Sequence, residues 1–130
     1  MDIQSRTDIE LLMTRFYEKV KKDDTIGFIF NDIARVNWEH HIPVICDFWE
    51  TILLDATSYR KNAMEVHYAL NGKVPFEEEH FDRWLHLFFE TVDEHFSGKI
   101  ATLAKNRAKS IAGLMLHKMK QENDGLTDYI

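Results

Sequence analysis

The sequence predicts an all-α protein of one domain. Only two prolines and five glycines occur in 130 residues, which leaves little of the turn chemistry that an all-β fold requires. Apolar residues recur instead at three- and four-residue spacings, the period of an amphipathic helix. The chain is long enough to bury a sizeable core, and 45% hydrophobic with 29% charged residues is typical of a globular protein. We therefore expect residues 1–130 to form a single domain of packed helices.

The first helix is predicted to open with the capping box Thr7-Asp8-Ile9-Glu10, in which side chains satisfy the first backbone N–H groups. Its apolar face follows the helical period and consists of Ile9, Leu12, Met13, Phe16, Tyr17 and Val20. Asp23-Asp24 ends this helix, and residues 26–30 form a short apolar turn segment. The polar residues 1–6 before the helix are expected to fray.

The second helix is predicted to run from Asn37, a favourable N-cap, to about Asp55. At about 100° per residue, one apolar stripe about 100° wide contains Trp38, His41, Ile45, Phe48, Trp49 and Ile52. His41 therefore lies among apolar side chains, whereas His40 points away from them. Pro43 lacks a backbone N–H, so we expect it to kink or delay the helix beside His41.

Three more helices follow in the predicted order. A very short apolar run, residues 63–70 around His67, lies between the breakers Thr57-Ser58 and Asn71-Gly72. The longest helix, near residues 77–97, carries Phe81, Trp84, Leu85, Phe88, Phe89, Val92 and Phe96 on one broad face. After Gly98, a last helix places Ile100, Leu103, Ala104, Ala108, Ile111 and Met115 inward. The polar tail, residues 121–130, is expected to fray.

The net charge, the cysteine content and the N-terminal residues limit the possible partners and cellular compartment of the protein. The net charge is −6 and no basic cluster exceeds two consecutive residues, so a surface that follows nucleic-acid phosphates is not expected. Cys46 is the single cysteine, which excludes an intramolecular disulfide and is typical of a reducing compartment. The N-terminal residues are polar, unlike a signal peptide or a membrane span. We expect a cytoplasmic protein with no nucleic-acid or membrane partner.

Helical phase separates the seven histidines, and only His41 and His67 lie squarely on apolar faces. For one such histidine, a hydrogen-bonded core residue is the commoner interpretation. Two of them on different helices, with an inward phenol at Tyr17 and an inward indole at Trp84, favour a haem site. His67 would ligate the iron through one ring nitrogen. Tyr17 and Trp84 would donate hydrogen bonds to a ligand on the other face.

Two other kinds of chemistry are less well supported. A carboxylate-bridged di-iron bundle needs two Glu-x-x-His motifs and two further glutamates. The chain offers one such spacing, Glu77 to His80, and no second copy. Nucleophilic catalysis would need an activated side chain, but Cys46 lies close along the helix to Ile42 and Trp49 and is most simply a small core residue.

The residues so placed form a pattern that resembles the truncated haemoglobins, and within them group III. The similar stretches are residues 16–20, 26–30 apart from Phe28, Trp38 with His41, 47–49, 62–64 with His67 and Leu70, 80–88 apart from His86, 91–98 apart from His95 and Ser97, and 107–112 apart from Lys109 and Ser110. They cover roughly residues 9 to 112 in the right order, and the run from His80 to Gly98 is the most specific. Three positions depart from the family pattern: Phe28 replaces a frequent proline, Lys61 a common glycine, and Pro43 is unusual.

The resemblance implies a two-over-two helical sandwich around one haem b. It implies His67 as the proximal iron ligand and Tyr17, His41 and Trp84 as the distal polar set, and it excludes His80 as an iron ligand. We expect the apolar walls of the cofactor site to comprise Phe30, Ile45, Phe48, Trp49, Met64, Phe81 and Phe88. Pro43, two residues after His41, leaves open whether that ring lies over the iron, on the iron or toward solvent.

The primary function predicted is binding of dioxygen, nitric oxide and carbon monoxide at ferrous iron, in nitric-oxide or oxygen stress. The alternative is a haem enzyme, a nitric-oxide dioxygenase or a peroxidase. The chain has no flavin or nicotinamide motif, so turnover as a dioxygenase would need a separate reductase. A third alternative is a helical interaction module without a cofactor. The chain is expected to be a monomer or a weak homo-oligomer.

Overall fold

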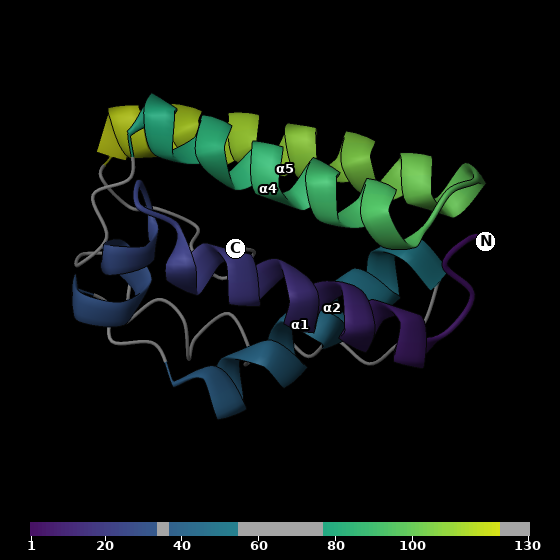
Figure 1. Ribbon diagram of the computed structural model, residues 1–130. Helices are drawn as coiled ribbons and strands as arrows, with labels where there is room; N and C mark the ends of the chain where they lie inside the picture. The colour runs from purple at the N-terminus through teal and green to yellow at the C-terminus, as the bar shows by residue number, and fades with distance from the viewer. Residues whose placement is uncertain (34–36, 55–76, 123–130) are drawn as a thin grey trace.

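The fold is built from helices alone in the part of the chain that the structure, a computed structural model, describes: residues 1–33, 37–54 and 77–122 (Figure 1). The elements are α1 (Arg6–Lys22), η1 (Ile29–Ile33, a π-helical turn), α2 (Trp38–Leu54), α4 (Glu78–His95) and α5 (Lys99–Glu122). No strand occurs among these residues. The predicted all-α class is therefore confirmed. None of the described helices is both long and apolar enough to cross a membrane.

The helices are arranged in two layers of two. α4 and α5 lie side by side in one layer, and α1 and α2 form the other (Figure 1). α1 packs on both α2 and α4, so it joins the two layers. Each helix has an apolar stripe, and two layers are the simplest way to bury such stripes against one another. The arrangement confirms the expected two-over-two sandwich.

α1 begins two residues earlier than its predicted capping box. Ser5 is the N-cap: its backbone is extended, and its Oγ accepts a hydrogen bond from the N–H of Asp8 at 3.4 Å. The predicted capping box at Thr7 was therefore wrong, because Ser5 supplies the same kind of acceptor two residues earlier. The buried face is the predicted one, Ile9, Leu12, Met13, Phe16, Tyr17 and Val20.

The N-terminal segment is docked rather than frayed. Ile3 is 1% exposed, and the Asp2 carboxylate accepts hydrogen bonds from the N–H groups of Ile100 (2.9 Å) and Ala101 (2.8 Å). Asp2 thus caps the N-terminus of α5, where a negative charge is favourable because backbone N–H groups point outward there. Hydropathy alone missed this contact because its partners lie at the far end of the chain. The tail that we expected to fray is residues 121–130, and of these residues 123–130 lie outside the described part.

α2 begins where the sequence predicted. The Asn37 carbonyl accepts hydrogen bonds from the N–H groups of His40 (3.1 Å) and His41 (2.8 Å), and its side chain accepts from His40 at 3.4 Å. Pro43 does not delay the start of the helix: α2 begins at Trp38 and continues through Pro43 to Leu54. Arg6 holds this helix against the start of α1 through Asp47 (2.6 Å) and Glu50 (2.9 Å).

α4 and α5 pack through unlike surfaces. α4 buries Phe81, Trp84, Leu87, Phe88, Thr91 and Val92, a set that adds Leu87 and Thr91 to the predicted face. Thr91 remains satisfied, because its hydroxyl donates to the Leu87 carbonyl at 2.7 Å. α5 buries mainly small side chains, Ala101, Ala104, Ala108 and Ala112, together with Met115. Ile100, Leu103 and Ile111, which we expected to be buried, are only partly buried, because the alanine row faces the other helices.

Candidate functional site

A cluster of four rings joins α1, η1 and α2. The Tyr17 centroid lies 5.1 Å from Trp38, 5.9 Å from His41 and 6.3 Å from Phe30. Trp38 in turn lies 5.7 Å from His41 and 5.9 Å from Phe30. All five pairs are edge to face or tilted, geometries that suit the charge distribution of aromatic rings. We call Tyr17, Phe30, Trp38 and His41 the distal cluster.

A second group of rings extends the aromatic surface toward α4. Phe16 contacts Trp84 edge to face at 5.5 Å. Trp84 stacks on Phe88 at 5.7 Å with planes 15° apart, and Phe88 stacks on Trp49 at 5.1 Å. Because Phe16 and Tyr17 are neighbours in α1, with centroids 4.7 Å apart, the two groups adjoin. The two layers therefore meet through flat aromatic side chains.

Two polar atoms in this aromatic surface are buried without a hydrogen bond to another described residue. They are the hydroxyl oxygen of Tyr17, whose residue is 1% exposed, and the indole nitrogen of Trp84, also 1% exposed. Leaving a buried polar group unsatisfied costs about 1–3 kcal/mol. Most buried polar groups in proteins are hydrogen-bonded, so two unsatisfied donors on packed helices call for an explanation such as a functional role.

The Tyr17 hydroxyl stays protonated at physiological pH. Burial raises the pKa of Tyr17 far above its ordinary value, since an ionised phenol would lose its hydration. The indole N–H of Trp84 lies close enough to oppose this rise in pKa, although the contact lacks the geometry of a full hydrogen bond. Tyr17 therefore presents an O–H that can donate, and Trp84 an N–H that can only donate.

His41 points into the protein and not toward solvent. It is 3% exposed, and its Nε2 is fully buried beside Tyr17 and Trp38. Of the three placements that Pro43 left open, the structure thus excludes the solvent-facing one. By contrast His40, the adjacent residue, is exposed, as predicted from helical phase. The sequence-predicted distal residues Tyr17, His41 and Trp84 are all buried in the aromatic region between the layers.

The predicted wall residues divide by burial. Phe30, Ile45, Trp49, Phe81 and Phe88 are each at most 4% exposed, and Phe48 is partly buried. Met64 and the predicted iron ligand His67 lie outside the described residues. Trp38 is the member of the distal cluster that the prediction left out. Its position three residues before His41 on the same stripe was the signal that could have identified it.

His80 and Cys46, on which the rival chemistries depended, have structural surroundings in the described part of the chain. Among the described residues, no group of three or more His, Cys, Asp or Glu side chains is arranged as metal ligands. His80 has another role, since its Nδ1 accepts a hydrogen bond from the Glu77 N–H at 2.9 Å and so helps to begin α4. Cys46 is fully buried, and that burial raises the pKa of its thiol to about 12. A thiol of this kind is inert as a nucleophile at physiological pH.

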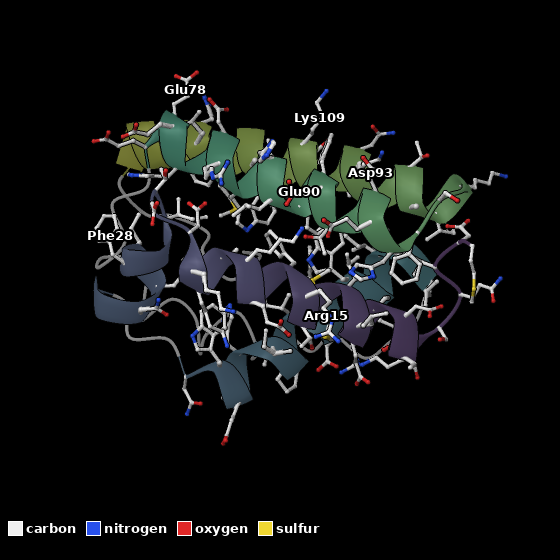
Figure 2. The ribbon with its side chains drawn as sticks, in the orientation of Figure 1. Arg15, Phe28, Glu78, Glu90, Asp93 and Lys109 are labelled. Carbon is white, nitrogen blue, oxygen red and sulfur yellow. The ribbon has the colours of Figure 1, made fainter. Side chains whose placement is uncertain are left out.

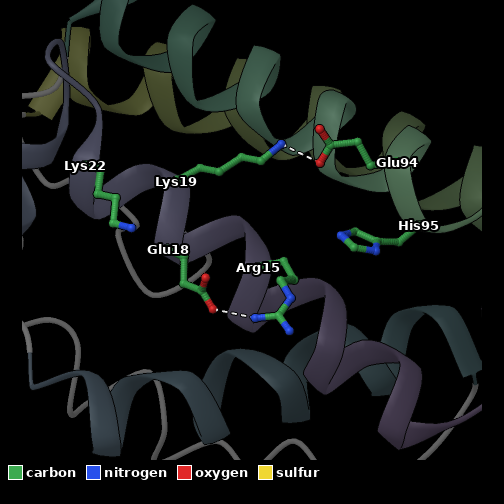
Figure 3. A pocket seen from close by; sticks show the side chains of 6 residues that line it. All are labelled: Arg15, Glu18, Lys19, Lys22, Glu94 and His95. Carbon is green, nitrogen blue, oxygen red and sulfur yellow. Dashed lines mark hydrogen bonds and ion pairs between the residues drawn. The ribbon is translucent and has the colours of Figure 1, made fainter.

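Two shallow surface pockets that are lined by described residues lie away from Tyr17, His41 and Trp84. A shallow cavity of about 180 Å³ is lined by Arg15, Glu18, Lys19, Lys22, Glu94 and His95 (Figure 3). Its charges are largely paired, with Lys19 to Glu94 at 2.6 Å and Arg15 to Glu18 at 2.8 Å. Figure 2 shows Glu78 and Lys109, which flank a second shallow cavity between α4 and α5, pointing outward. Neither cavity is lined by Tyr17, His41 or Trp84.

Comparison with known proteins gives two matches. The chain is 33% identical over 111 residues to a group 3 truncated haemoglobin of Campylobacter jejuni, which covers 83% of this chain and 85% of that protein. It also superposes on the crystal structure of the group III truncated haemoglobin from Campylobacter jejuni with a TM-score of 0.74 and 30% identity. That superposition covers 96% of this chain and 99% of the other. No model of a protein family matches the chain.

Proposed function

The chain belongs to the truncated haemoglobins of group III, and from this premise we propose that it binds one haem b and, through the haem, a diatomic ligand. Dioxygen is the principal ligand proposed, with nitric oxide and carbon monoxide binding at the same place. When bound, haem supplies an iron centre that coordinates such ligands. The residues of the chain hold the haem, exclude water and decide how long the ligand stays.

The observation that carries the proposal is the pair of buried donors, Tyr17 Oη and Trp84 Nε1. Neither has a hydrogen bond to another described residue, although both are fully buried. They belong to the flat aromatic surface between the two helical layers, which suits a planar macrocycle. A small ligand with acceptor atoms would satisfy both donors, and this would repay the cost of burying them.

The proposed roles follow from the chemistry of each side chain. His67 is the proposed axial ligand, because imidazole is the nitrogen donor that haem iron takes in globins. Tyr17 and Trp84 are the proposed donors to the diatomic ligand, and His41 is a third polar group, which lies beside Tyr17. Phe30, Ile45, Phe48, Trp49, Met64, Phe81 and Phe88 are the proposed apolar walls, which lower the local dielectric and so strengthen those hydrogen bonds.

An absorption spectrum tests the proposal directly. The purified chain is mixed with haem and measured in its ferric, ferrous and carbon-monoxide forms. We expect an intense Soret band at one haem per chain that shifts when carbon monoxide is added. A chain that takes up no haem, or shows only the spectrum of free haem, would overturn the proposal in favour of a helical interaction module.

We also propose that the protein acts on nitric oxide rather than transporting dioxygen. Two fixed donors, one of them a hydroxyl that stays protonated, favour slow release of dioxygen, which suits capture and not delivery. Turnover would require a separate reductase to return the iron to its ferrous form. Stopped-flow mixing of the ferrous, dioxygen-equilibrated protein with nitric oxide tests this role. Fast production of nitrate is the expected result, and a slow reaction without nitrate would contradict it.

A further inference from the structure

One cation lies directly on the distal cluster. The ammonium group of Lys21 sits over the ring of Trp38, 5.0 Å from its centroid. Trp38 itself contacts Tyr17 and His41 through its ring, so Lys21 is separated from the two polar groups by one side chain. A lysine over an indole is a favourable arrangement, because the ring face is negative.

The position of Lys21 is set by the fold. It lies one helical turn after Tyr17 in α1, on a neighbouring part of the helix surface. Its carbonyl accepts a hydrogen bond from the Asn31 side chain at 2.9 Å, which ties the end of α1 to η1, the element that carries Phe30. Both partners of the cation–π contact are thus attached to elements that form the distal cluster.

The charge of Lys21 is not neutralised by any other described side chain. Lys19 is paired with Glu90 and Glu94, and Lys105 is paired with Asp93, but Lys21 makes no such ion pair within the described part of the chain. The chain as a whole has a net charge of −6, which repels anions. The unpaired ammonium group of Lys21 reduces the repulsion of anions locally, beside the distal cluster.

We propose that Lys21, held on Trp38, determines ligand specificity by favouring the approach of small monoanions, the class that includes nitrite and azide, to the distal cluster. The effect on ligand binding rests on the proposed haem function, whereas the effect on anions near Trp38 does not. Trp38 is the partly buried indole on the solvent side, whereas Trp49 and Trp84 are each 1% exposed. A unit positive charge roughly 10 Å from an approaching anion, at an effective dielectric constant of about 50, changes the rate of anion association about two- to threefold.

The first experiment compares an anionic and a neutral ligand on the haem-loaded protein. Lys21→Gln is measured beside Lys22→Gln, which removes the same charge from the next residue. We expect Lys21→Gln to slow azide association with ferric protein about two- to threefold at low salt, with carbon-monoxide association to ferrous protein unchanged. Lys22→Gln should have the smaller effect. Equal effects of the two variants on azide, or a parallel change for carbon monoxide, would overturn the proposal.

A second experiment needs no haem and separates this proposal from the proposed function. Tryptophan fluorescence of the full chain before haem addition is quenched with iodide, an anion, and with acrylamide, which is neutral. Trp38 is the accessible indole, so quenching reports on its surroundings. In Lys21→Gln, iodide quenching should fall relative to acrylamide quenching, whereas in Lys22→Gln the ratio should be preserved. An unchanged ratio in Lys21→Gln would overturn the role of Lys21 whether or not haem binds.

Discussion

The rings of Tyr17 and His41 meet edge to face, with centroids 5.9 Å apart and planes 84° apart. One ring comes from α1 and the other from α2, and the two side chains are 1% and 3% exposed. A phenol that can donate and an imidazole that can donate or accept are thus buried side by side. This contact places two polar groups within an otherwise aromatic surface.

Replacing His67 tests the proposed iron ligand. Because no other side chain is proposed to bind the iron, His67→Ala should lower haem affinity by more than about 100-fold, beyond the effect usual for residues that only orient a ligand. The measurement is a haem titration followed at the Soret band, repeated with imidazole added to replace the missing ring. Recovery of the band with imidazole would identify the loss as one of ligation.

The control for this variant is His86→Ala. His86 is on the polar face of α4, where its side chain is 59% exposed and lies 3.7 Å from Glu90. Haem affinity should therefore stay as in the unmodified chain. If His67→Ala and His86→Ala bound haem equally well, the assignment of His67 as the axial ligand would be wrong.

Removing one hydroxyl tests the donor role of Tyr17. In Tyr17→Phe the ring contacts with Trp38 and His41 remain, but the buried O–H is lost. We expect dioxygen to dissociate about 5- to 150-fold faster, the equivalent of about 1–3 kcal/mol for one buried hydrogen bond. Flash photolysis or stopped-flow displacement by carbon monoxide gives the rate. Trp84→Phe, which removes the indole N–H, should act in the same direction.

The stability of Tyr17→Phe provides the matching control. Since the hydroxyl has no hydrogen bond to another described residue, its loss should leave the urea midpoint of the haem-free chain unchanged or raise it. A lower midpoint together with an unchanged dissociation rate would mean that Tyr17 serves the fold and not the ligand.

Asp23 should make stability depend on pH. Burial raises the pKa of Asp23, but hydrogen bonds from Arg83 at 2.6 Å and from the N–H groups of Ile26 and Thr25 outweigh it and hold the pKa below its ordinary value. A folded pKa below the unfolded value, which is about 3.9, stabilises the protein above that pH. This contribution is then lost as the pH falls through the folded pKa.

Asp23→Asn tests this pH dependence. At about pH 7 the variant should lose about 1–2 kcal/mol of unfolding free energy, toward the low end because the Arg83 side chain is 40% exposed. Below the folded pKa the two proteins should converge. Urea unfolding at several pH values measures the difference, with the exposed neighbour Asp24→Asn as control. A loss that is independent of pH would contradict the ionic origin.

Two glycines should respond to alanine with opposite signs. Gly98 has φ +136°, and a Cβ there would lie 2.7 Å from Cγ of Asp2, the residue that caps α5. Gly98→Ala should destabilise the protein by more than about 1 kcal/mol. Gly113 lies inside α5 with nothing within 4 Å of an added Cβ, so Gly113→Ala should stabilise by about 0.5–1 kcal/mol. Thermal unfolding of both variants checks the signs, and equal signs would refute the argument.

Periodicity alone was enough to predict α1, α2, α4 and α5 and most of their buried faces. The six buried residues of α1 are those on its predicted stripe, and His41 was assigned to the buried face of α2 and His40 to its exposed face. These predictions succeed because burial within one helix depends on the angle around its axis, which is a property of spacing. The capping residue of α1 and the docking of Asp2 were missed. Each depends on which side-chain acceptor lies beside the unpaired N–H groups at the start of a helix, and periodicity does not specify this.

Within the described residues, sequence by itself therefore determined the all-α class, the order of α1, α2, α4 and α5 and which face of each is mainly apolar. The short helix predicted at residues 63–70 lies outside the described residues. The family resemblance drawn from its motifs is matched by the relatives at 33% and 30% identity. Only the tertiary structure decided that Trp38 adjoins Tyr17, that the ammonium group of Lys21 lies over the Trp38 ring, and that Asp2 caps the N-terminus of α5. Contacts between different helices depend on how the two layers pack in three dimensions. The spacing of residues along one helix does not specify which other helices pack against it.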